Sequence, residues 1–125
     1  MTPRVAIVED NPDNRLLVRA LLEGLYVVDE YENGIDALGG MRRDPPALVL
    51  LDISLPGMDG VEVLARMREE PSMRAIPAVA LTAHAMAGDR DRYLGAGFDE
   101  YVAKPIVDEN ELLDAIARAL ARVGE

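Results

Sequence analysis

Short runs of apolar residues recur along the chain at intervals of about 20 to 30 residues. In order, they are Val5–Val8, Tyr26–Val28, Ala47–Leu51, Ala78–Leu81 and Tyr101–Ala103. The first, third and fourth runs are continuously apolar, which is typical of strands covered on both faces of a parallel sheet. The pattern therefore predicts five strands in a sheet with two covered faces.

The segments between these runs show the periodicity of amphipathic helices, with apolar residues three or four positions apart. The expected buried faces are Leu17, Ala20 and Leu21 in the first helix, Val61, Leu64, Ala65 and Met67 in the third, and Leu112, Leu113, Ile116, Ala117 and Leu120 in the last. Strands that alternate with helices predict a (βα)5 domain of the α/β class with a parallel sheet.

Capping residues indicate where several of these helices begin. Asn11 followed by Pro12 is typical of an N-cap and a first helical residue. Asp59 is well placed to cap the third helix. Asp108, with Glu111 three residues later, resembles a capping box at the start of the last helix.

The composition predicts one folded domain over residues 1–125, with no output domain. The chain has 125 residues, of which 50% are hydrophobic and 29% charged, and this balance excludes a disordered chain. No run approaches the roughly 18 uncharged apolar residues that a membrane span needs, and the first residues do not form a signal peptide. The absence of cysteine excludes a disulfide, a thiolate zinc site and a cysteine nucleophile. We therefore expect a soluble, cytoplasmic protein without a membrane partner.

The charge balance argues against nucleic acid as a partner and singles out one lysine. The chain has 13 basic and 23 acidic residues and a formal net charge of −10, so a phosphate backbone is repelled. Lys104 is the only lysine, because the other basic residues are all arginine. A compact ammonium and a planar guanidinium are not interchangeable, which makes Lys104 a candidate functional residue.

Polar side chains follow four of the predicted strands, at the edge where open α/β sheets bind their ligands. Glu9 and Asp10 follow the first strand, Asp52 the third, Thr82 the fourth and Lys104 the fifth. Converging carboxylates raise each other's pKa unless a cation compensates, and hard oxygen ligands suit Mg²⁺. A cation, an ammonium and a hydroxyl around an aspartate nucleophile are the groups that phosphoryl transfer requires.

Four segments together resemble one known family over essentially the whole chain. They are VAIVEDNPDN, LVLLDISLPGMDG, VALTAHAMAG and GFDEYVAKPI. The family is the receiver domain of two-component response regulators, in the CheY-like superfamily, and the EDNPDN segment is most similar to stand-alone regulators and to receivers attached to hybrid kinases. The resemblance implies a doubly wound, flavodoxin/CheY-like sheet of five parallel strands in the order 2-1-3-4-5.

The resemblance also implies a set of metal and phosphoryl ligands. Asp52 is implied as the phosphoacceptor, and the implied cofactor is Mg²⁺, with Mn²⁺ as an alternative. Asp10, Asp52 and the backbone carbonyl of Ser54 would bind the cation, and Glu9 would act through a bound water. Lys104 would pair with the phosphoryl group.

Further residues are implied to convert phosphorylation into a change of shape. Thr82 would donate a hydrogen bond to the phosphoryl group, and Tyr101 would turn inward as Thr82 moves. His84 would line the mouth of the site and, with Ser54, tune dephosphorylation. The Lys104–Pro105 peptide bond is cis in this family, and proline tolerates that isomer.

The implied function is a signalling switch in a two-component system or phosphorelay. A histidine kinase or a histidine phosphotransfer protein would supply the phosphoryl group. A downstream protein would bind the fourth helix, the fifth strand and the fifth helix. The resemblance implies a monomer that dimerises at most when phosphorylated. It implies no enzyme beyond slow autophosphorylation from small donors and slow autodephosphorylation.

Three alternatives compete with this hypothesis. A Mg²⁺-dependent phosphohydrolase with an aspartyl nucleophile is chemically allowed, but Ser54 stands two residues after Asp52, where such enzymes carry a second acid. A flavodoxin-like flavin or nucleotide binder needs a phosphate loop after the first strand, and EDNPDN places acids there instead. Within the family, the chain is alternatively a receiver excised from a hybrid kinase or a transcription factor.

Overall fold

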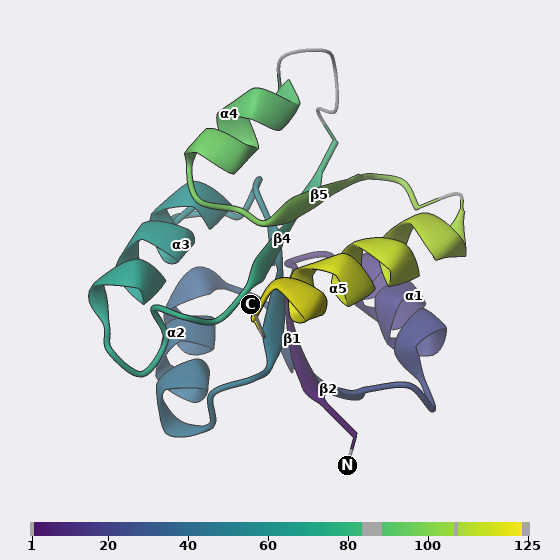
Figure 1. Cartoon of the computed structure of the whole chain (residues 1–125), viewed down its shortest axis with the longest axis horizontal. Coiled ribbons are helices and arrows are strands. Elements are labelled where there is room, and N and C mark those ends of the chain that lie inside the picture. The colour runs from purple at the N-terminus through teal and green to yellow at the C-terminus, as the bar shows by residue number, and fades with distance from the viewer. Residues whose placement is uncertain (1, 84–88, 107, 124–125) are drawn as a thin grey trace.

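One sheet of five parallel strands organises the computed structural model, which describes residues 2–83, 89–106 and 108–123 (Figure 1). The strands are β1 (Arg4–Val8), β2 (Val27–Tyr31), β3 (Leu48–Asp52), β4 (Ala78–Thr82) and β5 (Glu100–Ala103). The helices are α1 (Pro12–Leu22), α2 (Gly34–Arg43), α3 (Gly60–Glu69), α4 (Asp89–Gly95) and α5 (Glu109–Val123). The strand order β2-β1-β3-β4-β5 confirms the predicted fold.

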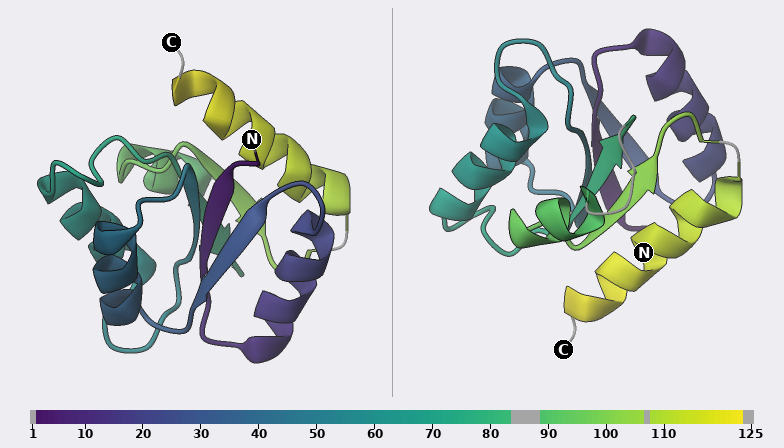
Figure 2. Two further views of the ribbon diagram at one scale, coloured as in Figure 1. Left: turned by 90° about the horizontal axis from the view of Figure 1, so that it is seen from below. Right: turned by 90° about the horizontal axis from the view of Figure 1, so that it is seen from above.

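Helices cover both faces of the sheet, with α1 and α5 on one face and α2, α3 and α4 on the other (Figure 2). Successive side chains of a strand point to opposite faces. In β1, for example, Val5 and Ile7 pack toward α1 and α5, whereas Ala6 and Val8 pack toward α2, α3 and α4. Every residue of β3 and β4 is buried, as their continuous apolar runs predict.

Hydrogen bonds that backbone N–H groups donate to side chains confirm the predicted helix starts. The Asn11 side-chain oxygen accepts hydrogen bonds from the backbone N–H groups of Asp13 and Asn14, at 2.8 and 3.3 Å. Asp59 caps α3 in the same way, and the Asp108 carboxylate accepts a backbone hydrogen bond in the first turn of α5. These caps fix the loops that lie at the carboxyl ends of the strands.

The buried face of α1 differs from the prediction. Val18 and Leu22 are its buried residues, whereas Leu17 is 39% exposed. The apolar stripe of α1 is wider than the strip that the sheet and α5 cover. Periodicity alone therefore selected Leu17, Ala20 and Leu21, which lie next to the residues that are buried. Strand β2 is also longer than its apolar run and ends at Tyr31, since its pairing with β1 continues to that residue.

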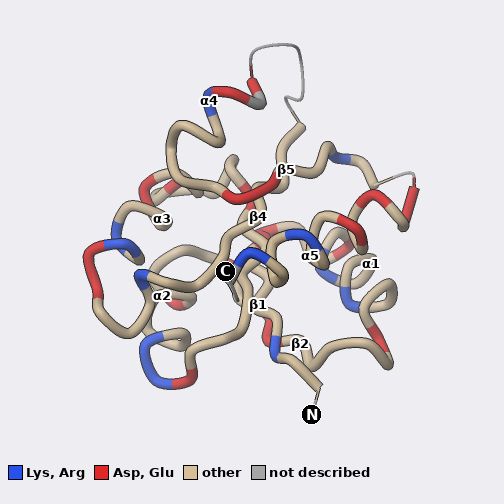
Figure 3. Tube along the Cα trace, in the orientation of Figure 1, with Lys and Arg blue, Asp and Glu red and all other residues tan. Residues whose placement is uncertain are grey.

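Charged residues are distributed over strands and helices rather than gathered on one element (Figure 3). Several arginines pair with acids at the surface, for example Arg4 with Asp29 at 2.8 Å and Arg118 with Glu100 at 2.7 Å. Exposed pairs of this kind contribute at most about 1 kcal/mol each. No helix within the described residues combines the length and the hydropathy needed to cross a membrane.

Candidate functional site

The carboxyl ends of three strands bring one ammonium and two carboxylates into contact. Asp52 is the last residue of β3, Glu9 follows β1 and Lys104 follows β5. Nζ of Lys104 lies 3.1 Å from Oδ1 of Asp52 and 3.2 Å from Oε1 of Glu9. The register explains the proximity, because Val8 and Leu51 are paired and the next residue of each strand is an acid. Asp52 and Glu9 are both buried, so water screens these ion pairs weakly.

Three carboxylates in this region form a cluster with the composition of a metal site. Glu9, Asp10 and Asp52 each offer an oxygen atom, and these oxygens lie within 4.8 Å of one another. The second carboxylate oxygen of Glu9, Oε2, is buried, and no other buried side-chain nitrogen or oxygen in the described part of the chain lacks a hydrogen-bond partner. Leaving a buried polar atom unpartnered is costly, and a cation would satisfy it. Hard oxygen donors of this kind fit Mg²⁺.

The electrostatics of Glu9 reflect this crowding. Burial, followed by the hydrogen bond and the charge of Asp52, raises the pKa of the Glu9 carboxyl from 4.5 to about 7, although the hydrogen bond from Asn14 and the charge of Lys104 lower it. For Lys104, burial lowers the pKa, but the hydrogen bond and the charge of Asp52, together with Glu9, outweigh it and leave the pKa raised. Near neutral pH, Glu9 therefore exchanges a proton while Lys104 remains charged.

The backbone around Asp52 is held close to its carboxylate. The Ser54 N–H donates a hydrogen bond to Oδ1 of Asp52 at 3.1 Å, as an extended turn begins after β3. Gly60 lies against the end of the strand, where an added Cβ would stand 2.4 Å from the Asp52 carbonyl oxygen. This position therefore has no room for a side chain, and the start of α3 approaches Asp52 closely.

Thr82 and Tyr101 lie on the α3 and α4 side of the strand ends. Thr82 is buried, and its hydroxyl oxygen lies 3.0 Å from the hydroxyl oxygen of Tyr93, a residue of α4. Tyr101 is partly buried, and its ring centroid lies 6.5 Å from that of Tyr93. The structure therefore places Thr82 and Tyr101 around a common tyrosine, while Lys104 joins the carboxylates.

Two further expectations concern residues next to these. The Lys104–Pro105 peptide bond is cis, as predicted. His84, which was expected at the mouth of the site, lies outside the described residues.

The sequence profile of the response regulator receiver domain matches residues 5–117. The chain belongs to this family. Members of the family act as switches in two-component signalling rather than as conventional enzymes, which agrees with the function implied by the four sequence segments.

Relatives of two kinds resemble this receiver domain. The polar-differentiation response regulator DivK of Brucella ovis is 41% identical over 107 residues, which cover 85% of this chain and 87% of DivK. The signal transduction histidine-protein kinase BarA of Shigella flexneri is 42% identical over 106 residues, covering 84% of this chain. The chain spans only 12% of the length of that kinase and 13% of the sensor histidine kinase GacS of Pseudomonas protegens.

Among solved structures, the receiver domain of the sensor histidine kinase PA1611 from Pseudomonas aeruginosa is similar to this receiver domain. It superimposes with a TM-score of 0.86 at 34% identity, and the match covers 97% of this chain and 99% of that domain. That structure has a magnesium ion coordinated in its active site cleft. The acidic cluster of Glu9, Asp10 and Asp52 offers oxygen ligands for such an ion in the present receiver domain.

The sequence analysis missed two residues that support the acidic pair of this receiver domain. The side-chain amide of Asn14 donates a hydrogen bond to Oε1 of Glu9 at 2.5 Å. The guanidinium of Arg15 donates to the backbone carbonyls of Glu9 and Asp10, at 2.7 and 3.3 Å. Both residues lie near the start of α1, where Asn14 is the last residue of the EDNPDN segment and Arg15 follows it. Their position in the sequence was therefore the available signal.

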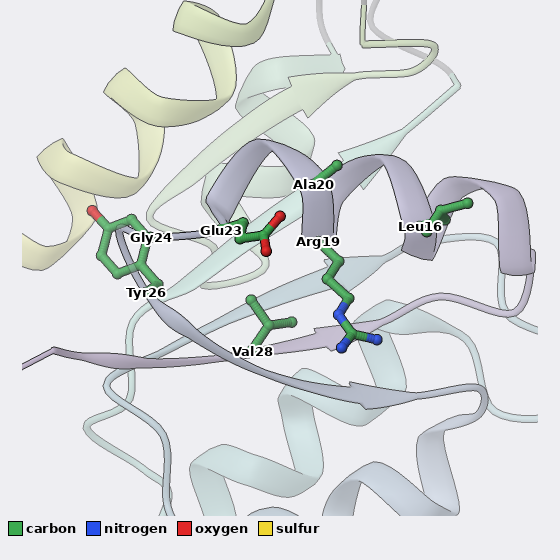
Figure 4. Close-up of a pocket in the computed structure, with 7 residues that line it drawn as sticks. All are labelled: Leu16, Arg19, Ala20, Glu23, Gly24, Tyr26 and Val28. Atoms are coloured by element: carbon green, nitrogen blue, oxygen red, sulfur yellow. The ribbon is translucent and has the colours of Figure 1, made fainter.

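A cavity of about 300 Å³ lies between α1 and β2, away from the acidic cluster (Figure 4). It is lined by Leu16, Arg19, Ala20, Glu23, Gly24, Tyr26 and Val28. Its two charged residues, Arg19 and Glu23, have opposite sign, and it includes none of the site residues. The cavity is therefore separate from the candidate site at the strand ends.

Proposed function

We propose that Asp52 is the phosphoacceptor of this receiver domain and that a phosphohistidine of a histidine kinase or a phosphotransfer protein is the donor. An Asp52 oxygen attacks the phosphorus atom, the new O–P bond forms as the N–P bond breaks, and the released imidazole takes up a proton. The contact between Asp52, Lys104 and the acidic cluster carries this proposal.

The ligands of the cation are proposed from the same cluster. Asp10 and Asp52 would bind it directly with the backbone carbonyl of Ser54, and Glu9 would act through water. Mg²⁺ is the proposed cofactor and Mn²⁺ an alternative. When bound, the cation supplies positive charge that offsets the charge of the incoming phosphoryl group.

The described side chains account for the remaining charge. Lys104 is already within ion-pair distance of Asp52. When the carboxylate oxygen forms the new O–P bond, the flexible ammonium can move to pair with a phosphoryl oxygen instead. Thr82 donates a hydrogen bond from its hydroxyl to the phosphoryl group, and Tyr101 fills the space that Thr82 leaves. Phosphorylation then biases a two-state element through one local change of charge.

The proposed output surface is formed by α4, β5 and α5. Tyr101 of β5 contacts Tyr93 of α4, so a movement of Thr82 reaches both elements. Arg118 and Arg122 of α5 pair with Glu100 of β5, at 2.7 and 2.9 Å, and connect the third element of the surface. A downstream protein in the cytoplasm would bind this surface, and the domain itself would be monomeric, with dimerisation confined to the phosphorylated form.

The experiment is intact-mass measurement after incubation with phosphoramidate, with Mg²⁺ and with a chelator. Wild-type protein should gain one phosphoryl group slowly and only with Mg²⁺, and should lose it again slowly. Asp52→Asn should gain none. Asp13→Asn is the matched control, because it removes one carboxylate charge from the neighbouring first turn of α1 and should leave labelling intact. Labelling of Asp52→Asn, or of the wild type without any cation, would contradict the proposal.

A further inference from the structure

A buried pair of hydroxyl groups connects α4 to the end of β4. The hydroxyl oxygens of Thr82 and Tyr93 lie 3.0 Å apart, and each residue is only 1% exposed. Water therefore does not compete for this hydrogen bond, and breaking it has a cost in the low-dielectric interior.

Tyr93 is held firmly by its own neighbours. Its ring packs edge-to-face on Phe98 with centroids 6.4 Å apart, and it contacts Tyr101 at 6.5 Å. It belongs to the apolar core formed by α2, α3 and α4 with one face of the sheet. The Tyr93 hydroxyl is thus held in place, and its hydrogen bond with Thr82 keeps the threonine side chain on the Tyr93 side.

The alternation of the strands places this pair on the other side of the sheet from the acids. In β4, Thr82 has the same parity as Ala78 and Ala80, which pack toward α2, α3 and α4. In β3, Asp52 has the same parity as Leu48 and Leu50, which pack toward α1 and α5. To donate a hydrogen bond to a group on Asp52, Thr82 must turn from the Tyr93 side toward the edge of the sheet.

We propose that Tyr93 is a positioning residue that retains Thr82 in the unphosphorylated arrangement and so opposes activation of the switch. This inference rests on the proposed function of Asp52 and Thr82. Either hydroxyl can donate in the Thr82–Tyr93 bond, but the Thr82 side chain cannot face Tyr93 and a group on Asp52 at the same time. Binding of the phosphoryl group therefore breaks the Thr82–Tyr93 bond, and a stronger bond makes that binding weaker.

The test measures how tightly the protein binds beryllofluoride, a phosphoryl mimic that attaches to a carboxylate oxygen. Fluorine NMR in excess Mg²⁺ and fluoride gives the beryllium concentration at half occupancy. Tyr93→Phe removes one oxygen and keeps the ring. Because a net hydrogen bond corresponds to roughly a fivefold change in an equilibrium, this variant should reach half occupancy at about one fifth of the wild-type concentration.

Tyr26→Phe is the matched control, since it removes the same oxygen from a tyrosine of the α1–β2 cavity and should leave the binding unchanged. Thermal unfolding without ligand separates the inference from simple damage: Tyr93→Phe should unfold at a lower temperature and yet bind the mimic more tightly. In a Thr82→Val background, where the partner hydroxyl is missing, Tyr93→Phe should have no further effect on binding.

Weaker or unchanged binding by Tyr93→Phe would overturn the inference, and so would a fivefold gain that persists in the Thr82→Val background. The proposed function has a separate criterion, because wild-type protein must bind beryllofluoride and Asp52→Asn must not. If the wild type fails to bind, the proposed function is wrong before Tyr93 is tested.

Discussion

Replacing Glu9 with glutamine isolates the cost of burying an ionised Glu9 beside the buried carboxylate of Asp52. Glutamine keeps an oxygen for the contacts with Asn14 and Lys104, and its amide takes the place of Oε2, which is buried without a partner. The amide can also donate to Asp52, as a protonated Glu9 does. The substitution therefore mimics permanently protonated Glu9 without changing its shape.

The magnitude follows from the raised pKa of Glu9. Between its ordinary value of 4.5 and about 7, the folded protein holds a proton that the unfolded chain releases, so the free energy of unfolding falls as pH rises through this window. At about 1.4 kcal/mol for each pH unit, the loss approaches about 3 kcal/mol. The glutamine of Glu9→Gln does not titrate, so this variant should not show that loss of stability. Relative to wild type, it should therefore gain about 3 kcal/mol of stability between pH 4.5 and pH 8.

The assay is urea unfolding of both proteins in a metal chelator at pH 4.5 and at pH 8, followed by circular dichroism. Glu69→Gln removes the same charge from an exposed position of α3 and should show no such pH-dependent gain. Saturating Mg²⁺ at pH 8 should reduce the difference in the free energy of unfolding between wild type and Glu9→Gln, because only the wild type has the fully ionised cluster that the cation stabilises. A stability difference that is the same at both pH values would refute the argument from burial.

Four other substitutions test the framework of the site. Gly60→Ala should lower stability by roughly 1–3 kcal/mol and slow phosphorylation, because its Cβ meets the Asp52 carbonyl. Gly39→Ala, in the open middle of α2, should instead raise stability by roughly 0.5–1 kcal/mol. Equal urea midpoints for the two variants would contradict both predictions. Asn11→Ala should cost about 1 kcal/mol through loss of two capping bonds, and an unchanged melting temperature would argue against the cap. Lys104→Gln should slow labelling by phosphoramidate by roughly 10²-fold, and an undiminished rate in intact-mass time courses would remove Lys104 from the mechanism.

The strands and the members of the acidic site were predictable because both depend on local features of the chain. Continuous apolar runs mark strands with two covered faces, and parallel strands bring their carboxyl ends to one edge. Asp52 and Lys104 are far apart in the chain, yet each directly ends or follows a strand, so their contact at 3.1 Å follows from topology. The cap formed by Asn11 was likewise predictable, since its partners lie within three residues.

Features that depend on how elements pack were not predictable. Periodicity selected Leu17 as a buried residue of α1, but the helix turns Val18 and Leu22 inward, because the strip covered by its neighbours is narrower than its apolar stripe. Tyr93 gave no functional signal in the sequence, since its meeting with Thr82 depends on the exact placement of α4 over β4. Such contacts depend on the distances between elements, and the spacing of residues along one element does not determine those distances.

The isolation of Lys104 among twelve arginines gives the protein an internal chemical reporter. Its amine is the only side-chain amine in the chain, and it is 18% exposed between two carboxylates. An ammonium held in this way reacts slowly with acylating reagents, because it must first lose both its proton and its partners. Whatever draws Asp52 or Glu9 away from it changes that reactivity. The rate of acylation at this one position, followed by the mass of the peptide that contains it, therefore measures the state of the site.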